Sequence, residues 1–424
     1  MANLIIMCVF TLFSVCSFAS KAKARGYIFL SVAISSASGY LVGRQVDINS
    51  LTDLTYLIYL ILFLGMFTYF ATYWLKGYEK SSLIRDFPGF SFTAWGLVLI
   101  LLPLLLVNLY IFSNSISLIM VDAVVDLDSF KNENGVDEFL RPRVGSLALL
   151  VSRVFSPLGF LCIPLIVLAC IRDDRKLAFL LFLSSLNWVL LGLMSFSRSG
   201  LIGYIFVCFM LAISFWQYFR PDIRKSILRA ISIPLVVMFS LLVYVTVERF
   251  SDPEFWVFAQ AEGSIITNPV LFSIFDYFGQ WIEHSFILFE STDFVLLFQG
   301  HHVTTLLHQV GIPFLSDRVS WSEYRLDVFG SWSNYFVGLP YIFYVDFGLF
   351  GLLILFCIAS IMVILSMQSG TIRALYFILT PYLLLVSCMF FSDSHFAYNY
   401  VQQAGYYALA LFIFLKFKFK FGAS

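Results

Sequence analysis

The chain has 424 residues, of which 60% are hydrophobic and 12% are charged, and its formal net charge is zero. About a quarter of the residues in soluble domains are charged, so this composition excludes an ordinary soluble protein, and we expect no nucleic-acid partner. Apolar runs of about 18 residues or more recur along the chain, and each is long enough to cross roughly 30 Å of hydrocarbon. The sequence therefore predicts an all-α polytopic membrane protein.

Eleven membrane spans are predicted in chain order. They lie near residues 3–20, 27–43, 54–75, 92–112, 145–170, 177–196, 200–219, 230–247, 336–366, 374–391 and 404–416. The run at 336–366 is longer than a bilayer requires, so we expect this span to be tilted or kinked. Residues 1–20 lack the basic start of a signal peptide, and we expect them to form an uncleaved first span.

The basic residues set the orientation of these spans. Most Lys and Arg residues fall in alternate loops, namely residues 21–25, 76–85, 172–176 and 220–229, Arg373 and the tail KFKFK. Because short cytoplasmic loops carry an excess of Lys and Arg, we place these segments and the C-terminus in the cytoplasm. The N-terminus is then expected on the outer face, together with most of the acidic residues.

Two substantial segments are expected on the outer face, at 113–144 and at about 248–335. The second is the largest part of the chain outside the predicted spans. We therefore divide the chain into residues 1–247 with eight spans and the first outer segment, a large outer loop at 248–335, and residues 336–424 with three spans and the basic tail. The cytoplasmic loops are short, so any chemistry is expected outside.

No cofactor and no metal is expected. Neither a GxxxxGK[ST] nor a GxGxxG motif occurs, and the seven cysteines all fall within predicted spans without the spacing of metal ligands or of a disulfide framework. Asp126 and Asp128 form a DxD motif, which holds divalent metals in some glycosyltransferases, but a solvated acidic loop is the favoured interpretation. The pattern of His301, His302 and His308 has no paired metal-ligand spacing.

Arginine dominates the basic residues of the outer face, where Lys131 is the single lysine. The arginines there are Arg44, Arg141, Arg143, Arg153, Arg198, Arg249, Arg318 and Arg325. Arginine binds phosphate through two parallel hydrogen bonds and stays charged in apolar surroundings, so this set suits a phosphate or pyrophosphate substrate. The alternative is that these side chains bind lipid headgroups or pair with carboxylates.

Arg198 and Arg153 stand out from the other outer arginines. Arg198 lies in SRSG, a short turn predicted between two spans, which would hold it near the headgroup plane. Arg153 lies several residues inside a predicted span, and an ionisable residue at such a place suggests a functional site. The alternative for Arg153 is that its side chain extends along its own helix to the interface.

The large outer loop supplies further polar candidates. A histidine or carboxylate there can act as general base on a sugar hydroxyl. Asp276, Glu283 and Glu290 are spaced by seven residues, which predicts one stripe along a helix. That stripe would be either one wall of a sugar site or, as we favour, the wet face of an interfacial helix.

Asp346 is the main acidic residue expected inside a span. On a continuous helix it would lie roughly 15–18 Å below the surface, because an α-helix rises about 1.5 Å per residue. A buried carboxylate is costly unless it is paired, and Arg153 or Arg198 is a possible partner.

Several of these motifs, taken in order, resemble the Wzy-type O-antigen polymerases of the bacterial inner membrane. They are an outward SRSG turn at 197–200, a span that carries RVFSP at 153–157, one large late outer loop, and an N-x11-DFG-x-x-G span from Asn334 to Gly351. The resemblance implies a helical GT-C-like glycosyltransferase architecture with its active site facing the periplasm. The related O-antigen ligases have a His-Asn-type pair where this chain has Ser333-Asn334, which favours the polymerase. The arginine-x10-glycine pattern of some polymerases is absent.

The resemblance also implies a reaction and roles for residues. A glycan chain is transferred from undecaprenyl pyrophosphate to a second lipid-linked repeat unit, so donor and acceptor are the main partners, beside membrane lipids and a chain-length regulator protein. The expected pyrophosphate ligands are Arg198, Arg249 and Arg318 or Arg325, with Arg153 as a positioning or second phosphate group. Candidates for the general base are His301, His302, Glu323 and Asp327. Further substrate-binding residues are Asn334, Asp346, Arg141 and Arg143.

Two other functions remain open at this stage. One is an O-antigen ligase-like glycosyltransferase, which shares the layout of spans and loops. The other is a transporter or flippase of lipid-linked sugars, which needs a charged path through the spans. Few charges fall within the predicted spans, chiefly Arg153 and Asp346, and the sequence shows no internal repeat of the kind that transporters use.

Overall fold

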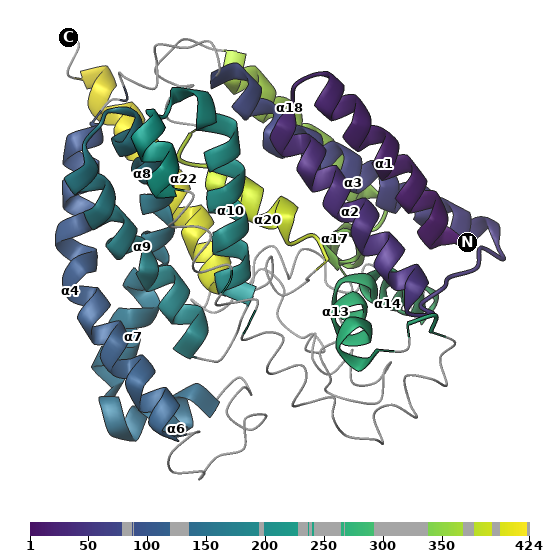
Figure 1. Ribbon diagram of the computed structural model, residues 1–424, viewed down its shortest axis with the longest axis horizontal. Coiled ribbons are helices and arrows are strands. Elements are labelled where there is room, and N and C mark those ends of the chain that lie inside the picture. Colours follow the sequence, from purple (N-terminus) through teal and green to yellow (C-terminus); the bar gives the residue numbers. More distant parts are fainter. Residues whose placement is uncertain are drawn as a thin grey trace. The chain divides into compact units, whose positions relative to one another are not determined.

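A computed structural model describes residues 1–78, 87, 89–118, 135–194, 199–227, 236, 240, 264–266, 268–291, 338–367, 377–391 and 399–421. Every regular element within these ranges is a helix (Figure 1). This confirms the predicted all-helical class, which follows from long apolar runs whose backbone groups must be satisfied within one segment.

The first part of the chain contains most of the long helices. They are α1 (Ala2–Ala19), α2 (Lys23–Leu41), α3 (Leu51–Tyr78), α4 (Phe90–Ile116), α6 (Gly135–Val144), α7 (Ser146–Phe155), the 3-10 helix η3 (Ser156–Leu161), α8 (Cys162–Ile171), α9 (Arg175–Met194), α10 (Ser199–Phe215) and the 3-10 helix η4 (Trp216–Tyr218). The later helices are α13 (Pro269–Gly279), α14 (Trp281–Ser291), α17 (Gly338–Phe347), α18 (Phe350–Met367), α20 (Thr380–Cys388) and α22 (Asn399–Phe421).

Among the described residues, six helical segments are long and apolar enough to cross a membrane, so the protein is membrane-embedded. They are Ala2–Ala19, Leu51–Tyr73, Phe90–Ile116, Ser146–Ile171, Arg175–Met194 and Gly200–Tyr218, and each coincides with a predicted span. The predicted span 27–43 is helix α2, which is more polar, and 230–247 lies almost wholly outside the described residues. The last two predicted spans correspond to the short helix α20 and to α22, whose apolar part is Val401–Leu415.

The predicted span 336–366 is not one helix. Helices α17 and α18 meet at an angle of 106°, and Gly348 between them has a φ of 58°, a left-handed conformation that glycine adopts readily at the end of a helix. The expected kink is therefore confirmed and lies at the DFG sequence. The depth expected for Asp346 stays a prediction, because the break follows this residue and the residues just before Gly338 lie outside those described.

The packing of the chain divides it into two compact units. Unit 1 comprises residues 1–73, 232–364 and 386–399, and unit 2 comprises residues 74–231, 365–385 and 400–424. In unit 1, α1 and α2 form an antiparallel hairpin, closed at Lys21 with a φ of 61°. The rings of Phe10, Phe13 and Phe29 pack between the two helices.

Helix α3 of unit 1 begins at a capping box. The backbone N–H groups of Asn49 and Ser50 donate to the Asp53 carboxylate at 3.0 and 2.9 Å, and the Asp53 N–H donates to the Ser50 hydroxyl at 3.0 Å. This pattern satisfies N–H groups that the first turn of a helix leaves unpaired. The capping box therefore sets the end of the loop between α2 and α3, and Arg44 lies in this loop.

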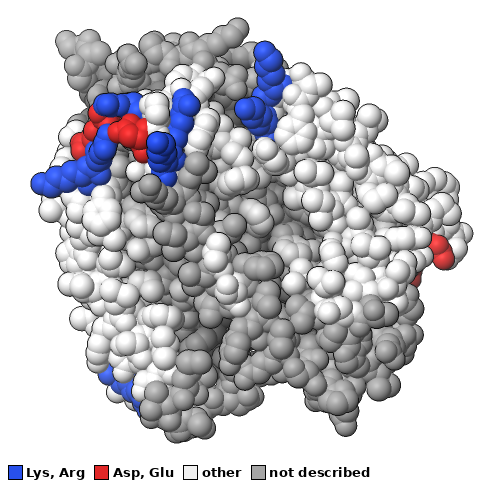
Figure 2. Space-filling model, in the orientation of Figure 1, with Lys and Arg blue, Asp and Glu red and all other residues white. Residues whose placement is uncertain are grey.

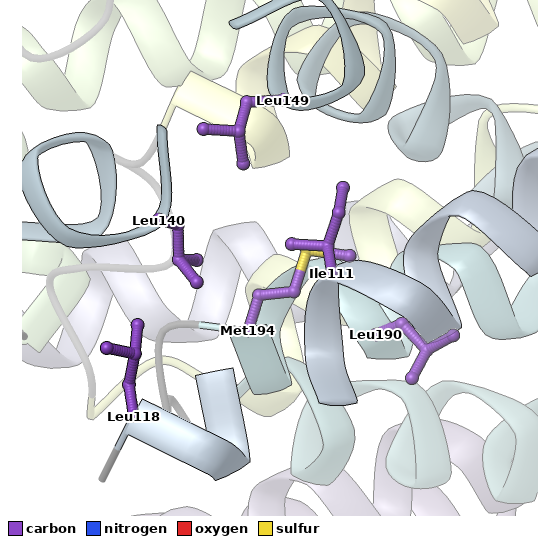
Figure 3. Packing of buried hydrophobic residues seen from close by; sticks show 6 residues of the cluster. All are labelled: Ile111, Leu118, Leu140, Leu149, Leu190 and Met194. Atoms are coloured by element: carbon purple, nitrogen blue, oxygen red, sulfur yellow. The ribbon is translucent and has the colours of Figure 1, made fainter. Parts of the chain in front are cut away.

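Unit 2 is built on α4 and α9, which pack along each other, with α8 and α10 beside α9. A small apolar cluster joins the C-terminal part of α4 to α6, α7 and the end of α9 (Figure 3). Its buried members are Ile111, Leu118, Leu140, Leu149, Leu190 and Met194. The two short helices α6 and α7 are thereby fixed on the longer ones.

Candidate functional site

The predicted site residues divide into those that the structure describes and those that it does not. All eight residues assigned to catalysis and Asn334 lie outside the described residues: Arg198, Arg249, Arg318, Arg325, His301, His302, Glu323 and Asp327. Asp126, Asp128 and His308 lie outside them as well. Arg141, Arg143, Arg153 and Asp346 are described, and the first three belong to one corner of unit 2.

We call α6 and α7, with Arg141, Arg143 and Arg153, the arginine corner. Arg141 and Arg143 lie in the last turn of α6, and Arg153 lies in the last turn of α7. All three side chains are exposed. Positive charge near a helix C-terminus is favoured by the helix dipole, which stabilises these placements locally. Gly145, with a φ of 82°, separates the two helices.

Buried neighbours in the sequence orient these arginines. Leu140 is fully buried in the apolar cluster and precedes Arg141, and Leu149 on α7 is 5% exposed in the same cluster (Figure 3). Successive helical residues point about 100° apart, so burying a leucine on one side leaves its basic neighbour on another. The cluster therefore sets which face of the arginine corner is exposed.

A buried polar network lies beneath the arginine corner. The Asn108 side chain on α4 donates to the Asn187 side-chain oxygen on α9 at 2.6 Å and to the Ser156 hydroxyl at 2.8 Å. Its own oxygen accepts from the Ser152 hydroxyl on α7 at 2.6 Å. All four residues are at most 1% exposed, and their side chains bond to one another and to backbone carbonyls, as polar groups buried within a membrane protein require.

The opposite end of unit 2 carries a group of mixed charge (Figure 2). Arg175 contacts Asp222 and Asp173, and Arg220 contacts the same two carboxylates. The 26-residue segment Ser146–Ile171 runs from the arginine corner to this end. At about 1.5 Å per residue it measures up to roughly 39 Å, enough to cross the hydrocarbon of a bilayer.

In unit 1, Arg44 joins two acidic residues of the predicted stripe. Its Nε lies 2.9 Å from the Asp276 carboxylate, and its Nη1 lies 2.8 Å from the Glu283 carboxylate. The three side chains are 15%, 23% and 25% exposed. We call these residues the Arg44 clamp, and they bear out the carboxylate-pairing alternative for this arginine.

The expected single helix from Asp276 to Glu290 is wrong. Helix α13 ends at Gly279, and α14 begins at Trp281. A Cβ on Gly279 would lie 2.2 Å from the backbone nitrogen of Gly39, so the backbones of α13 and α2 touch at this place. Asp276 and Glu283 bind Arg44 from two helices, whereas Glu290 is exposed.

A serine strengthens the contact of α2 with these helices. The Ser35 hydroxyl donates to the Phe278 carbonyl at 2.5 Å and accepts from the Trp281 indole N–H at 2.8 Å. Trp281 is fully buried. The described beginning of the large predicted loop is therefore docked on α2 by an ionic clamp at one position and by close backbone packing at another.

Asp346 lies in unit 1 near the end of α17 and is 1% exposed. On the same helix, the Pro340 carbonyl accepts a hydrogen bond from the Tyr59 hydroxyl of α3 at 3.2 Å. The rings of Tyr56, Tyr59 and Tyr344 pack against one another. Tyrosines of α3 and α17 thus lie beside the segment that holds this carboxylate, and its pairing with Arg153 or Arg198 stays a prediction.

Sequence reasoning missed Asn108 and Asn187 as organising residues. Each is an amide in the middle of an apolar run, in LLVNLY and SLNWVL. A polar side chain in such a run marks a buried contact. The sequence therefore points to these two asparagines, although it does not identify their partners.

Comparison of the chain with protein-family models, curated proteins and solved structures finds no match.

Proposed function

We propose that the protein polymerises lipid-linked oligosaccharide repeat units at the outer face of the bacterial inner membrane. The proposal rests on the ordered motifs SRSG, RVFSP and N-x11-DFG-x-x-G and on one structural observation. That observation is the arginine corner, in which three exposed arginines lie on the consecutive short helices α6 and α7 of unit 2. A surface of this kind suits a pyrophosphate at a membrane interface.

In this reaction the acceptor hydroxyl oxygen attacks the anomeric carbon of the donor glycan. The bond between that carbon and the pyrophosphate oxygen breaks, and the hydroxyl proton passes to a general base, for which His301, His302, Glu323 and Asp327 are candidates. Negative charge grows on the leaving pyrophosphate. Guanidinium groups that are already in place stabilise this charge as it develops, and the arginine corner together with Arg198 is assigned this task.

The two ends of unit 2 provide a matched test. Arg141, Arg143 and Arg153 are replaced by Ala singly and together, with Arg220→Ala and Arg224→Ala as controls at the opposite end. Each variant is expressed in cells that lack the native gene, and its level in the membrane is checked by immunoblot. Surface polysaccharide length is then read from a gel.

The triple variant is expected to carry only single-repeat surface glycan, while the two controls keep long chains. Long chains in the triple variant at normal membrane level would overturn the role of the arginine corner. Long lipid-linked chains that fail to reach the surface carrier in cells without the protein would instead indicate a ligase. Movement of a lipid-linked repeat unit across liposomes without elongation would indicate a flippase.

A further inference from the structure

The buried amides of Asn108 and Asn187 can adopt one arrangement. Both N–H groups of Asn187 donate to backbone carbonyls, those of Leu101 at 2.8 Å and Ser184 at 2.9 Å. Its oxygen must then accept, and it accepts from Asn108. Both N–H groups of Asn108 are used in turn, on Asn187 and Ser156, so its oxygen is left for the Ser152 hydroxyl. The order of bonds is therefore directional.

Helix α7 needs such a constraint because the chain changes from an α-helix to a 3-10 helix at its end. The 3-10 helix η3 begins at Ser156, with Pro157 next, and separates α7 from α8. A 3-10 turn has three residues per turn against 3.6 in an α-helix, so the rotation of α7 relative to α8 differs from that in one continuous α-helix. The hydrogen bond from Ser152 to Asn108 links α7 to α4 directly.

Ser152 and Arg153 are consecutive residues of α7 with opposite surroundings. Ser152 is 1% exposed and also lies 3.8 Å from the sulfur of Met194, the last residue of α9. Arg153 is exposed. Because successive side chains diverge by about 100° on a helix, holding Ser152 against Asn108 determines the direction of Arg153.

We infer that Asn108, held in one orientation by Asn187, is a positioning residue that sets the rotation of α7 through Ser152 and so presents Arg153 on the exposed face of the arginine corner. The importance of this for catalysis rests on the proposed function, but the rotation itself does not. Met194 links the same network to the end of α9, four residues before Arg198 in the sequence.

The experiment measures rotation by cysteine labelling in isolated membranes. Cysteine is placed at position 153, which is exposed, or at position 149, which is buried, and labelling by a maleimide is compared with that of the parent protein, whose seven cysteines supply the background. Each reporter is combined with Ser152→Ala, Ser152→Thr or Asn108→Leu. Ser115→Ala is the matched control, because Ser115 is a buried serine of α4 whose hydroxyl, within the described part of the chain, donates inside its own helix, to the Ile111 carbonyl.

In the reporter variants Arg153→Cys and Leu149→Cys without a further substitution, which serve as the parent pair, position 153 is expected to label at least several-fold faster than position 149. Ser152→Ala and Asn108→Leu reduce this ratio at least threefold, whereas Ser152→Thr, which keeps the hydroxyl, and Ser115→Ala leave it unchanged. An unchanged ratio in Ser152→Ala would overturn the inference, as would equal labelling of the two positions in the parent pair. Asn108→Leu is not needed for this result, so a failure of that variant to fold leaves the test intact.

The labelling result and the proposed function fail separately. If the ratio shifts in Ser152→Ala but Arg153→Ala leaves surface chains long, α7 is positioned as inferred and the phosphate role of Arg153 is wrong. If Arg153→Ala shortens the chains and the ratio does not shift, the function stands and the positioning role of Asn108 is wrong.

Discussion

The Nη1 atom of Arg44 lies 2.8 Å from the Glu283 carboxylate, although 239 positions separate the two residues in the chain. The same guanidinium binds Asp276 through Nε, so one side chain holds both α13 and α14 beside the end of α2. Arg44, which the sequence predicts to lie on the outer face, therefore has structural partners and is distinct from the arginines assigned to pyrophosphate.

Breaking the Arg44 clamp is expected to destabilise the protein. Arg44→Ala leaves two partly buried carboxylates without their cation, and we expect a loss of about 1–3 kcal/mol in the free energy of unfolding. Arg44→Glu is expected to be worse, and Glu283→Arg added to it restores part of the loss. Thermal unfolding of the purified protein in detergent measures these effects. Arg220→Ala, which removes an exposed ion pair, serves as control and changes stability by less than about 1 kcal/mol.

The contact between Gly279 and Gly39 is expected to tolerate no side chain. In Gly279→Ala the new Cβ would meet the Gly39 backbone nitrogen at 2.2 Å, and crowding of this kind typically costs about 1–3 kcal/mol. The matched change is Gly96→Ala in α4, where a Cβ meets nothing within 4 Å. We expect it to be neutral or stabilising by up to about 1 kcal/mol, because Ala favours helix over Gly. Equal unfolding temperatures for the two variants would contradict the close contact.

The charged group at the other end of unit 2 predicts an acid-dependent stability. Desolvation opposes the shift, but hydrogen bonds from the backbone N–H groups of Asp222 and Ile223 and the charge of Arg175 lower the pKa of Asp222. A lowered folded-state pKa adds stability that is complete above the unfolded value of about 3.9 and is lost as the pH falls through the folded pKa.

Between pH 5 and pH 3, the unfolding temperature of the native protein should therefore fall more than that of Asp222→Asn, because the asparagine carries no charge at this position at any pH. The other carboxylates are present in both proteins, so their effect on the unfolding temperature is the same and drops out of the comparison. Parallel curves for the two proteins across this range would show that Asp222 contributes nothing.

The proposed phosphate role of Arg153 predicts a graded loss of activity. Arg153→Ala removes charge and hydrogen bonds together, and the rate of chain extension should fall roughly 100-fold. Arg153→Lys keeps the charge but loses the two parallel hydrogen bonds to phosphate, so its rate should lie between those of the native protein and Arg153→Ala. The measurement uses membranes that carry the protein and a purified lipid-linked repeat unit, with Arg224→Ala as an active control. Full activity of Arg153→Ala would exclude the role.

Much of the fold follows from local sequence. Apolar runs such as 92–112 and 177–196 predict α4 and α9 within a few residues, because a membrane helix satisfies its own backbone and needs only apolar side chains over about 20 residues. The length of the run 336–366 predicts a tilt or a kink, and the structure places the kink at Gly348. The same reasoning overestimated continuity at Gly279, where helices α13 and α14 separate against α2.

The sequence by itself determined that this protein is helical and membrane-embedded and where its long helices lie, because these properties depend on neighbouring residues. Only the tertiary structure decided that Arg44 binds Asp276 and Glu283, and that Asn108 connects three helices through Ser152, Ser156 and Asn187. Such pairings join segments that are tens to hundreds of residues apart, and local hydropathy does not predict them. They arise because a buried charge or amide must find a partner wherever packing brings one near.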